Sequence, residues 1–254
     1  MKVKLLSGWS NPGGSTEHHI SLTNLLNENG YDCTFYGPHP YHLSKCKSKY
    51  LHEAVIDPSD TVISHFLKLP KEFKVQKHIL SCHETNLFPL KEMDLSQYDL
   101  IHCVSERQWD WHGVDHPHVV IPPTVDKISW TNNNTGFAGV VGSIDDHKQP
   151  HLAVKLALED GFDMVKLYGK VTNQAYFDTF IMPLWDKVQI TEHEENKNFM
   201  YNSIDAVYHT SKRETYGLVE AECELAGIPF KGNKNKPEVL ERSEILERWK
   251  NILS

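Results

Sequence analysis

The sequence predicts an α/β protein built from two halves, each a parallel sheet crossed by helices. Short β-branched or apolar runs alternate with amphipathic stretches along the chain, and two prolines, Pro122 and Pro123, interrupt this pattern before the polar stretch Thr131 to Gly136. Such alternation is typical of parallel sheets with crossover helices. Because proline ends regular hydrogen bonding, we place the boundary here, with domains at residues 1–125 and 126–254.

The expected strands are short runs of apolar and β-branched residues. In the first half they are Val3 to Ser7, Cys33 to Tyr36, Thr61 to Phe66, His78 to Cys82, Leu100 to Ser105 and Val119 to Ile121. In the second half they are Gly139 to Val141, Met164 to Tyr168, Val188 to Ile190 and Ala206 to His209. Runs of this length and composition are typical of strands.

Three helices are expected from apolar residues that recur with helical spacing. Ser15 to Asn29 is followed by Gly30, which is a common helix stop, and Gln149 to Glu159 has the same character. Pro237 to Leu253 is a charged amphipathic segment. We assign this last helix to the second domain, with packing back onto the first domain as an alternative.

Composition narrows the class of protein. The 254 residues are 39% hydrophobic and 24% charged, as in an ordinary globular chain, and the formal charge of -8 provides no global positive field for nucleic acid or an anionic membrane. The sequence has no apolar run of about 18 residues, so no integral membrane segment is expected. Five cysteines, without CxxC spacing, favour a reducing compartment, and we expect a cytoplasmic protein.

The most informative stretch runs from Ser211 to Glu222 and follows the expected strand at Ala206 to His209, so it predicts a strand, a loop and a helix. Gly217 marks a point of close backbone approach, and the amides at a helix start attract an anion such as a diphosphate. Glu214 and Glu222 bracket this point. Their carboxylates accept hydrogen bonds from hydroxyls, which suits a sugar and a ribose on either side of the diphosphate.

This stretch resembles the E-x7-E motif of retaining glycosyltransferases of family GT4, which have the GT-B fold. The glycine, the following Leu-Val and the Ala-Gly-x-Pro at Ala226 to Pro229 are all in register. Weaker likenesses are Val120 to Asp126 (the family's IPNGVD segment), Val141 to Lys148 (its VGR…K loop), Tyr201 to Asp205 (its Y…AD segment), Gly13-Gly14 (its N-terminal glycine loop) and His83 (its HD position).

The resemblance implies two Rossmann-like α/β/α domains facing across a cleft, and it implies roles for individual residues. Lys148 would contact the donor diphosphate, Glu222 the ribose, and Glu214, with the amides at Tyr216, Gly217 and Leu218, the donor sugar. We count Lys148, Glu214 and His83 as catalytic candidates.

One departure from the family concerns the phosphate site. Ser143 stands where the family usually has an arginine, so one cation is missing from the donor site. Ser143 and Arg213 are both counted with the donor-binding residues, and Lys212, His147 or Lys170 are alternatives for replacing that charge.

In the first half, Gly13 and Gly14 precede a helix whose positive end a substrate can approach, and Ser15 or Thr16 is expected to cap it. These two glycines are counted with the donor-binding residues. His83 is expected to hydrogen-bond a donor-sugar hydroxyl or to help form the acceptor site.

No metal site is expected. The sequence has no Asp-x-Asp pair to hold a divalent ion against the diphosphate, and the group His112, Asp115, His116 and His118 has no HExxH pattern. An NAD-dependent oxidoreductase is disfavoured because Trp9 and Pro12 occupy the turn where GxGxxG would lie.

We therefore expect a metal-independent transferase that moves a hexose from a nucleoside diphosphate sugar, UDP- or GDP-linked, to an acceptor hydroxyl with retention. No cofactor is expected. The acceptor class stays open among glycan, lipid, protein, small molecule and, less expected, modified nucleic acid. The alternatives are a GT-B epimerase or phosphorylase and a catalytically weak sugar-nucleotide binding protein.

Overall fold

The computed structural model describes residues 1–65, 67–70, 73–84, 90–192 and 194–254. The chain forms two compact units: unit 1 comprises Met1–Thr124 and Glu238–Ser254, and unit 2 comprises Val125–Pro237. The final helix, which we assigned to the second domain, thus groups with unit 1, the arrangement we held as the alternative.

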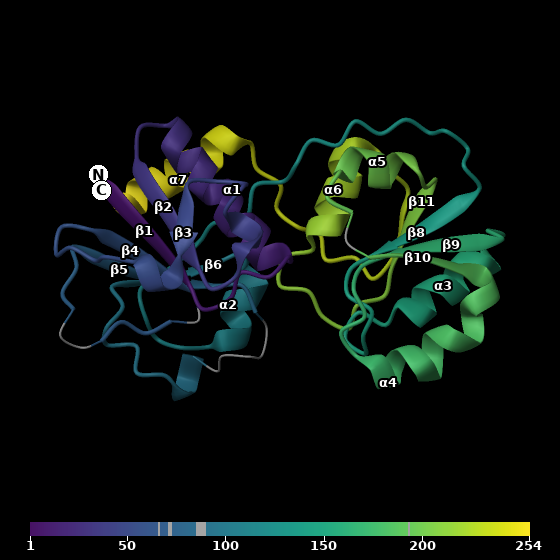
Figure 1. The fold of residues 1–254 in the computed structure, drawn as a ribbon, viewed down its shortest axis with the longest axis horizontal. Coiled ribbons are helices and arrows are strands. Elements are labelled where there is room, and N and C mark those ends of the chain that lie inside the picture. The colour runs from purple at the N-terminus through teal and green to yellow at the C-terminus, as the bar shows by residue number, and fades with distance from the viewer. Residues whose placement is uncertain (66, 71–72, 85–89, 193) are drawn as a thin grey trace. The chain divides into compact units, whose positions relative to one another are not determined.

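Unit 1 contains a seven-stranded parallel sheet in the order β3-β2-β1-β4-β5-β6-β7 (Figure 1). Its strands are β1 (Lys2–Ser7), β2 (Asp32–Gly37), β3 (Ser48–Tyr50), β4 (Thr61–His65), β5 (Lys77–Cys82), β6 (Leu100–Cys103) and β7 (His118–Val120). All except the short polar strand β3 were predicted; Phe66, the expected last residue of the third predicted strand, lies outside the described residues. Because the strands are parallel, their carboxyl ends meet at one edge of the sheet.

Two helices of unit 1 begin where a capping residue sets their first turn, and not where the sequence pattern predicted. They are α1 (Gly14–Glu28), α2 (Glu106–His112) and α7 (Arg242–Leu253), with 3-10 turns at Pro40–His42, Leu51–Glu53 and Leu90–Glu92. Ser105, predicted as a strand end, instead caps the unpredicted helix α2, because its hydroxyl accepts a hydrogen bond from the Gln108 amide at 3.1 Å. Helix α7 begins at Arg242, later than predicted, because Glu241 and Glu244 form a capping box.

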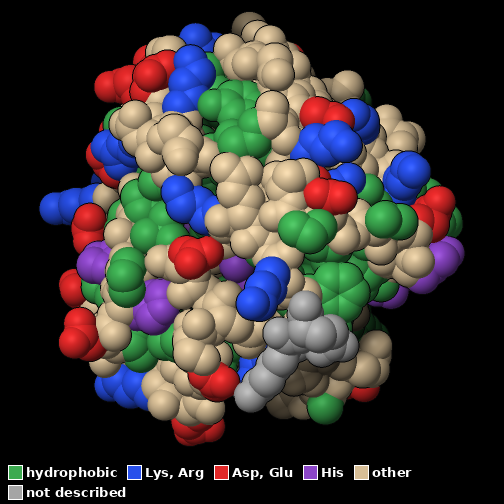
Figure 2. All heavy atoms as spheres, turned by 90° about the vertical axis from the view of Figure 1, so that its left-hand side faces the viewer, with side chains coloured by type: hydrophobic (Ala, Val, Ile, Leu, Met, Phe, Trp, Pro, Cys, Tyr) green, Lys and Arg blue, Asp and Glu red, His purple; other side chains and the backbone are tan. Residues whose placement is uncertain are grey.

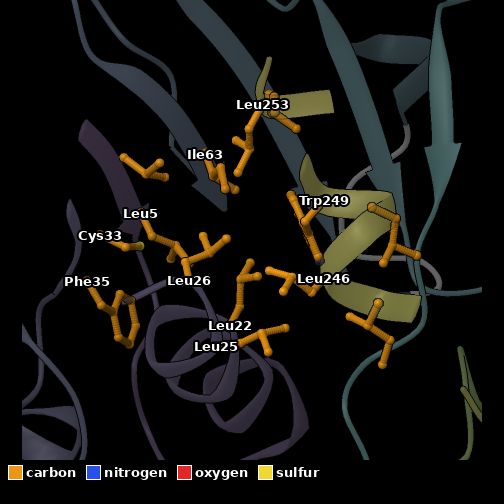
Figure 3. Close-up of a cluster of buried hydrophobic side chains, with 14 of the residues drawn as sticks. Leu5, Leu22, Leu25, Leu26, Cys33, Phe35, Ile63, Leu246, Trp249 and Leu253 are labelled. Carbon is orange, nitrogen blue, oxygen red and sulfur yellow. The ribbon is translucent and has the colours of Figure 1, made fainter. Parts of the chain in front are cut away.

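The main core of unit 1 includes side chains from the last helix (Figure 3). Leu246, Trp249 and Leu253 of α7 pack in one buried cluster with residues of β1 and α1, among them Leu5 and Leu26. Trp249 is fully buried. Burial of a large apolar side chain contributes about 1.5–3 kcal/mol, so α7 is an integral part of this core.

Unit 2 contains a five-stranded parallel sheet in the order β10-β9-β8-β11-β12. Its strands are β8 (Phe137–Val141), β9 (Met164–Tyr168), β10 (Val188–Thr191), β11 (Ala206–His209) and β12 (Phe230–Gly232). Its helices are α3 (Pro150–Glu159), α4 (Gln174–Tyr176), α5 (Lys197–Asn202) and α6 (Leu218–Ala226), and α4 continues into a π-helical turn at Phe177–Ile181 and a 3-10 segment at Met182–Lys187. The predicted strand, loop and helix at β11 and α6 are confirmed, whereas β12 and the helices between β9 and β11 were not predicted.

The predicted α/β class with two parallel sheets is confirmed. On the face of the molecule that Figure 2 draws, lysine and arginine side chains are interspersed with aspartate and glutamate. None of the helices in the described part of the chain is both long enough and apolar enough to cross a bilayer.

Candidate functional site

The loop between β8 and α3 is organised by Asp145. Its carboxylate accepts hydrogen bonds from the hydroxyls of Ser143 and Thr172, at 2.6 and 2.8 Å, and from the amides of His147 and Lys148, at 3.0 and 2.8 Å. Burial acts to raise the pKa of Asp145, but these hydrogen bonds, that of Ser143 foremost, lower it. Asp145 therefore stays ionised and fixes the turn that carries Lys148. Ser143, predicted to bind donor, points its hydroxyl at Asp145.

This loop is hydrogen-bonded to the loop after β11, and two predicted site residues meet where the loops adjoin. Thr210 donates a hydrogen bond to the carbonyl oxygen of Gln149 at 2.7 Å. The ammonium of Lys148 then hydrogen-bonds and ion-pairs with the carboxylate of Glu214. Two residues that the sequence predicted for one site are therefore in direct contact.

Glu214 has a second partner, His209, whose Nε2 lies 3.1 Å from Oε1 of Glu214. Burial acts to raise the pKa of Glu214, but the hydrogen bond with His209 and the charge and hydrogen bond of Lys148 outweigh it and lower this pKa to about 2. Glu214 is therefore an anion at neutral pH, partly shielded from water. Sequence reasoning missed His209, although its place as the last residue of a predicted strand is a common one for site residues.

The predicted helix start at Gly217 is present, and this glycine has a close side-chain neighbour. Gly217 precedes the helix with a φ of 98° and is buried, as is Tyr216; Leu218 is the first helical residue. A β-carbon at position 217 would lie 3.2 Å from the side chain of Asn235. The side chain of Asn235 is thus a close neighbour of Gly217. The first amides of α6 still have no partner within the helix.

Glu222 is almost fully buried inside α6 and is held from two sides. Its Oε1 accepts a hydrogen bond from Lys197 at 2.5 Å and its Oε2 one from the hydroxyl of Tyr201 at 2.6 Å. Lys197 also pairs with Asp126 at 2.6 Å. Burial acts to lower the pKa of Lys197, but the charges of Glu222 and Asp126 raise it. Lys197 was missed because nothing in its sequence context marks it.

The basic residues considered as replacements for the missing arginine lie at the surface of this loop region. Arg213 is exposed, as is Lys212, whose ammonium lies 3.5 Å from the carboxylate of Asp146. An exposed pair of this kind contributes little to stability, so Lys212 is free to move.

In unit 1, Gly13 and Gly14 stand at the start of α1 as predicted, but the expected cap is wrong. The N-cap is Gly13, and no side chain caps the helix. The hydroxyl of Thr16 is buried without a hydrogen bond to any described residue. A β-carbon at Gly13 would meet no atom within 4 Å, so the backbone is open at this point.

His83, the third catalytic candidate, follows β5 and belongs to a group that sequence reasoning missed. We call this group the histidine cluster: His18, His19, His65, His83 and His102. His83 is partly exposed and the other four are buried. Three of them, at positions 65, 83 and 102, lie at or near the carboxyl ends of neighbouring strands, and two lie on α1. The sequence signal that could have revealed this cluster is the presence of histidines at the ends of several predicted parallel strands.

Four histidines of this cluster have pKa values below the ordinary range, because their rings are shielded from water. Burial lowers the pKa of His102 to about 4, and it lowers the pKa values of His18, His19 and His83 well below the ordinary range. These four rings are therefore neutral at pH 7. Of the group His112, Asp115, His116 and His118, for which we expected no metal, His118 stacks on Trp109 with ring centres 3.7 Å apart.

Comparisons with known proteins identify the fold. No protein-family model and no curated protein sequence matches this chain. Among solved structures, HepE of Anabaena in complex with UDP-glucose is similar with a TM-score of 0.67 and 13% identity, over 91% of this chain and 80% of HepE. AviGT4, a glycosyltransferase involved in avilamycin A biosynthesis, has a TM-score of 0.65 and 19% identity, over 98% of this chain and 88% of its own.

A third similar structure is WaaG, a glycosyltransferase involved in lipopolysaccharide biosynthesis, with a TM-score of 0.64 and 11% identity, over 100% of this chain and 90% of WaaG. At these identities the likeness concerns the fold. The chain therefore has the GT-B fold of glycosyltransferases.

Proposed function

We propose that this protein is a retaining glycosyltransferase that moves a hexose from a nucleoside diphosphate sugar to an acceptor hydroxyl. The observation that carries this proposal is the contact between Lys148 and Glu214, four residues before the start of α6, in a chain with the GT-B fold. A cation, an anion and a helix start therefore follow the carboxyl ends of the neighbouring strands β8 and β11. Together they supply partners for a phosphate and for sugar hydroxyls.

Lys148 and the first amides of α6 would bind the diphosphate. Two phosphates carry about two negative charges, so they compete well with a single carboxylate for the ammonium of Lys148. Glu214 would keep His209 as a partner and turn its free oxygen to the sugar hydroxyls, together with the amides at Tyr216 to Leu218. Ser143 and Arg213 would line the phosphate side of this site.

Glu222 would contact the ribose. Its carboxylate is positioned by Lys197 and Tyr201, and a carboxylate oxygen has room for more than one hydrogen bond. In unit 1, Gly13, Gly14 and His83 would contribute to binding of the sugar and the acceptor.

The proposed reaction balances with no added reagent. The bond between the anomeric carbon and the diphosphate oxygen breaks while the acceptor oxygen attacks the same face of the sugar, and the departing phosphate takes the acceptor's proton. Lys148 stabilises the charge that develops on the leaving phosphate. No carboxylate pair for Mg²⁺ is needed in this scheme, so we propose metal-independent transfer.

The test is incubation of the full chain with UDP-glucose, followed by proton NMR, then with GDP-, ADP- and TDP-sugars. We expect slow hydrolysis that releases glucose with the α configuration, at a rate that added Mg²⁺ or Mn²⁺ does not raise. An isomerised donor would identify an epimerase, and phosphate-dependent cleavage a phosphorylase. Binding of the donor without cleavage would identify a binding protein, and β-glucose as the first product would exclude retention.

A further inference from the structure

Three members of the histidine cluster bring ring nitrogens to one point inside unit 1. One ring nitrogen each of His18, His83 and His102 lies within 4.8 Å of the others. The three residues come from α1, from the end of β5 and from β6. In tetrahedral Zn²⁺ sites with bonds of about 2.0–2.1 Å, ligand nitrogens are about 3.3–3.4 Å apart, so modest ring rotations would bring these nitrogens to that spacing.

His102 has the hydrogen bonding of a metal ligand. Its Nε2 lies 2.9 Å from the carbonyl oxygen of Ile121, which can only accept, so Nε2 carries the proton. The ring is neutral, so its lone pair is on Nδ1, where a bound ion would displace the hydrogen bond from the hydroxyl of Ser81. A backbone carbonyl on the outer nitrogen is the usual support of a histidine that binds metal through the other nitrogen.

The tautomer of His83 follows from that of His102. The hydroxyl of Ser81 lies 2.9 Å from Nδ1 of His102 and 3.0 Å from Nε2 of His83. Since Ser81 has one proton and Nδ1 of His102 can only accept, Ser81 donates to His102 and accepts from Nε2 of His83. This leaves the lone pair of His83 on Nδ1.

His18 is the observation that points to a ligand. Both of its ring nitrogens are buried and have no hydrogen bond to any residue in the described ranges. His78, also buried in this sheet, is different: its nitrogens contact Ser64 at 2.9 Å and the carbonyl oxygen of Gln97 at 3.0 Å. His19 also has two buried ring nitrogens without a hydrogen bond to a described residue, but only His18 brings a nitrogen within 4.8 Å of ring nitrogens of both His83 and His102.

We propose that His18, His83 and His102 bind one divalent transition-metal ion, with water completing a tetrahedral site. Neutral imidazoles are ligands that Zn²⁺ prefers, and hard ions such as Mg²⁺ prefer oxygen. The bound ion would link helix α1 to the carboxyl ends of β5 and β6. It would belong to unit 1, whereas Lys148 and Glu214 belong to unit 2. With Nδ1 on the ion and Nε2 on Ser81, His83 has no nitrogen left for a substrate, so this proposal replaces the substrate-binding role of His83 given above.

The test uses the full chain, stripped with EDTA, dialysed and titrated with ZnCl₂ in a calorimeter and with CoCl₂ in a spectrophotometer. We expect one ion per chain and the intense visible absorption of four-coordinate Co²⁺, abolished by Zn²⁺. His18→Gln and His102→Gln are expected to lower the affinity at least 100-fold. His78→Gln, which changes a buried histidine of the same sheet outside the site, is the matched control and should bind as the unmodified protein does.

Circular dichroism establishes whether each variant folds. If His18→Gln or His102→Gln does not, His83→Gln, at the partly exposed position, and the Zn²⁺-induced shifts of imidazole NMR signals in the unmodified protein decide the question. The proposal is overturned if the unmodified protein binds no Zn²⁺ tighter than millimolar. It is equally overturned if folded His18→Gln, His83→Gln or His102→Gln keeps full affinity, or if His78→Gln loses as much as they do.

Discussion

The ammonium of Lys148 ion-pairs with the carboxylate of Glu214, although 66 positions separate the two residues in the chain. The contact exists because β8 and β11 are neighbours in the sheet and the loops that follow them are hydrogen-bonded to each other. It places a fixed positive charge beside a fixed negative one at the start of α6.

Replacement of Lys148 by methionine should lower turnover of the donor about 100-fold or more at saturating donor, because the leaving phosphate loses its cation. Lys155→Met, at an exposed position of helix α3 in the same unit, is the control and should change the rate less than twofold. Hydrolysis of UDP-glucose measured by NMR tests both. A rate for Lys148→Met within twofold of the unmodified protein would contradict the assignment.

Glu222→Gln should weaken donor binding more than it slows the reaction. The amide keeps the shape but loses charge, so a hydrogen bond to a ribose hydroxyl is weakened by about 1.5 kcal/mol, which corresponds to about a tenfold rise in KM. Glu224→Gln, exposed on the same helix, is the matched control. A loss in kcat with unchanged KM would instead place Glu222 at the reacting centre.

Stability at acid pH should report the state of Glu214. Its pKa is about 2 in the folded protein, against an ordinary value of 4.5, so the unfolded chain takes up a proton first as the pH falls. The stabilisation is therefore complete above about pH 5.5, and about 1.4 kcal/mol of it is lost by pH 3.5.

This loss is measured as a difference between two proteins. The glutamine of Glu214→Gln does not titrate. The difference in the free energy of urea unfolding between the unmodified protein and Glu214→Gln should therefore shrink by this amount as the pH falls from 6 to 3.5. Asp146→Asn, at an exposed carboxylate nearby, should show a much smaller change. A pH-independent difference for Glu214→Gln would mean that the carboxylate has no depressed pKa.

Trp249→Ala should destabilise unit 1 by about 3–5 kcal/mol, because it leaves a large void where α7 packs against α1 and β1. Thermal or urea unfolding measures the loss. Trp185→Ala, at an exposed tryptophan of unit 2, is the control and should change stability by less than about 0.5 kcal/mol. Equal effects of the two substitutions would show that the last helix is not part of the core.

The parts of the fold and of the candidate site that could be predicted are those that a local sequence pattern determines. The central strands and the helices α1 and α3 follow from apolar runs and periodicity. The family resemblance assigned Lys148 and Glu214 to one site, but their direct contact was not predicted. Helix α2 was missed because its cap, Ser105, reads as the end of a strand. Glycine is needed at position 217 because φ is 98° there, and the close side chain of Asn235 adds to this need. Asn235 lies eighteen positions later in the chain, so no local pattern reveals this neighbour.

The histidine cluster was missed for a related reason. His83 stood out alone, and nothing in the sequence says that His18, on a helix, meets His102, on a strand. The strand order of the sheet brings them together, and that order is a property of the whole unit. The partners of Glu222, namely Lys197 and Tyr201, are likewise set by the packing of α5 on α6.

Because α7 completes a core whose other members precede residue 125, unit 1 is interrupted in the chain by the whole of unit 2. During synthesis, residues 125–237 emerge as one continuous stretch and have all their own strands before Trp249 is made. The core of unit 1 is incomplete until Trp249 has been made, so Leu5 and Leu26 lack their contacts with α7 until then. The segment made earliest is therefore the one that depends longest on protection from aggregation.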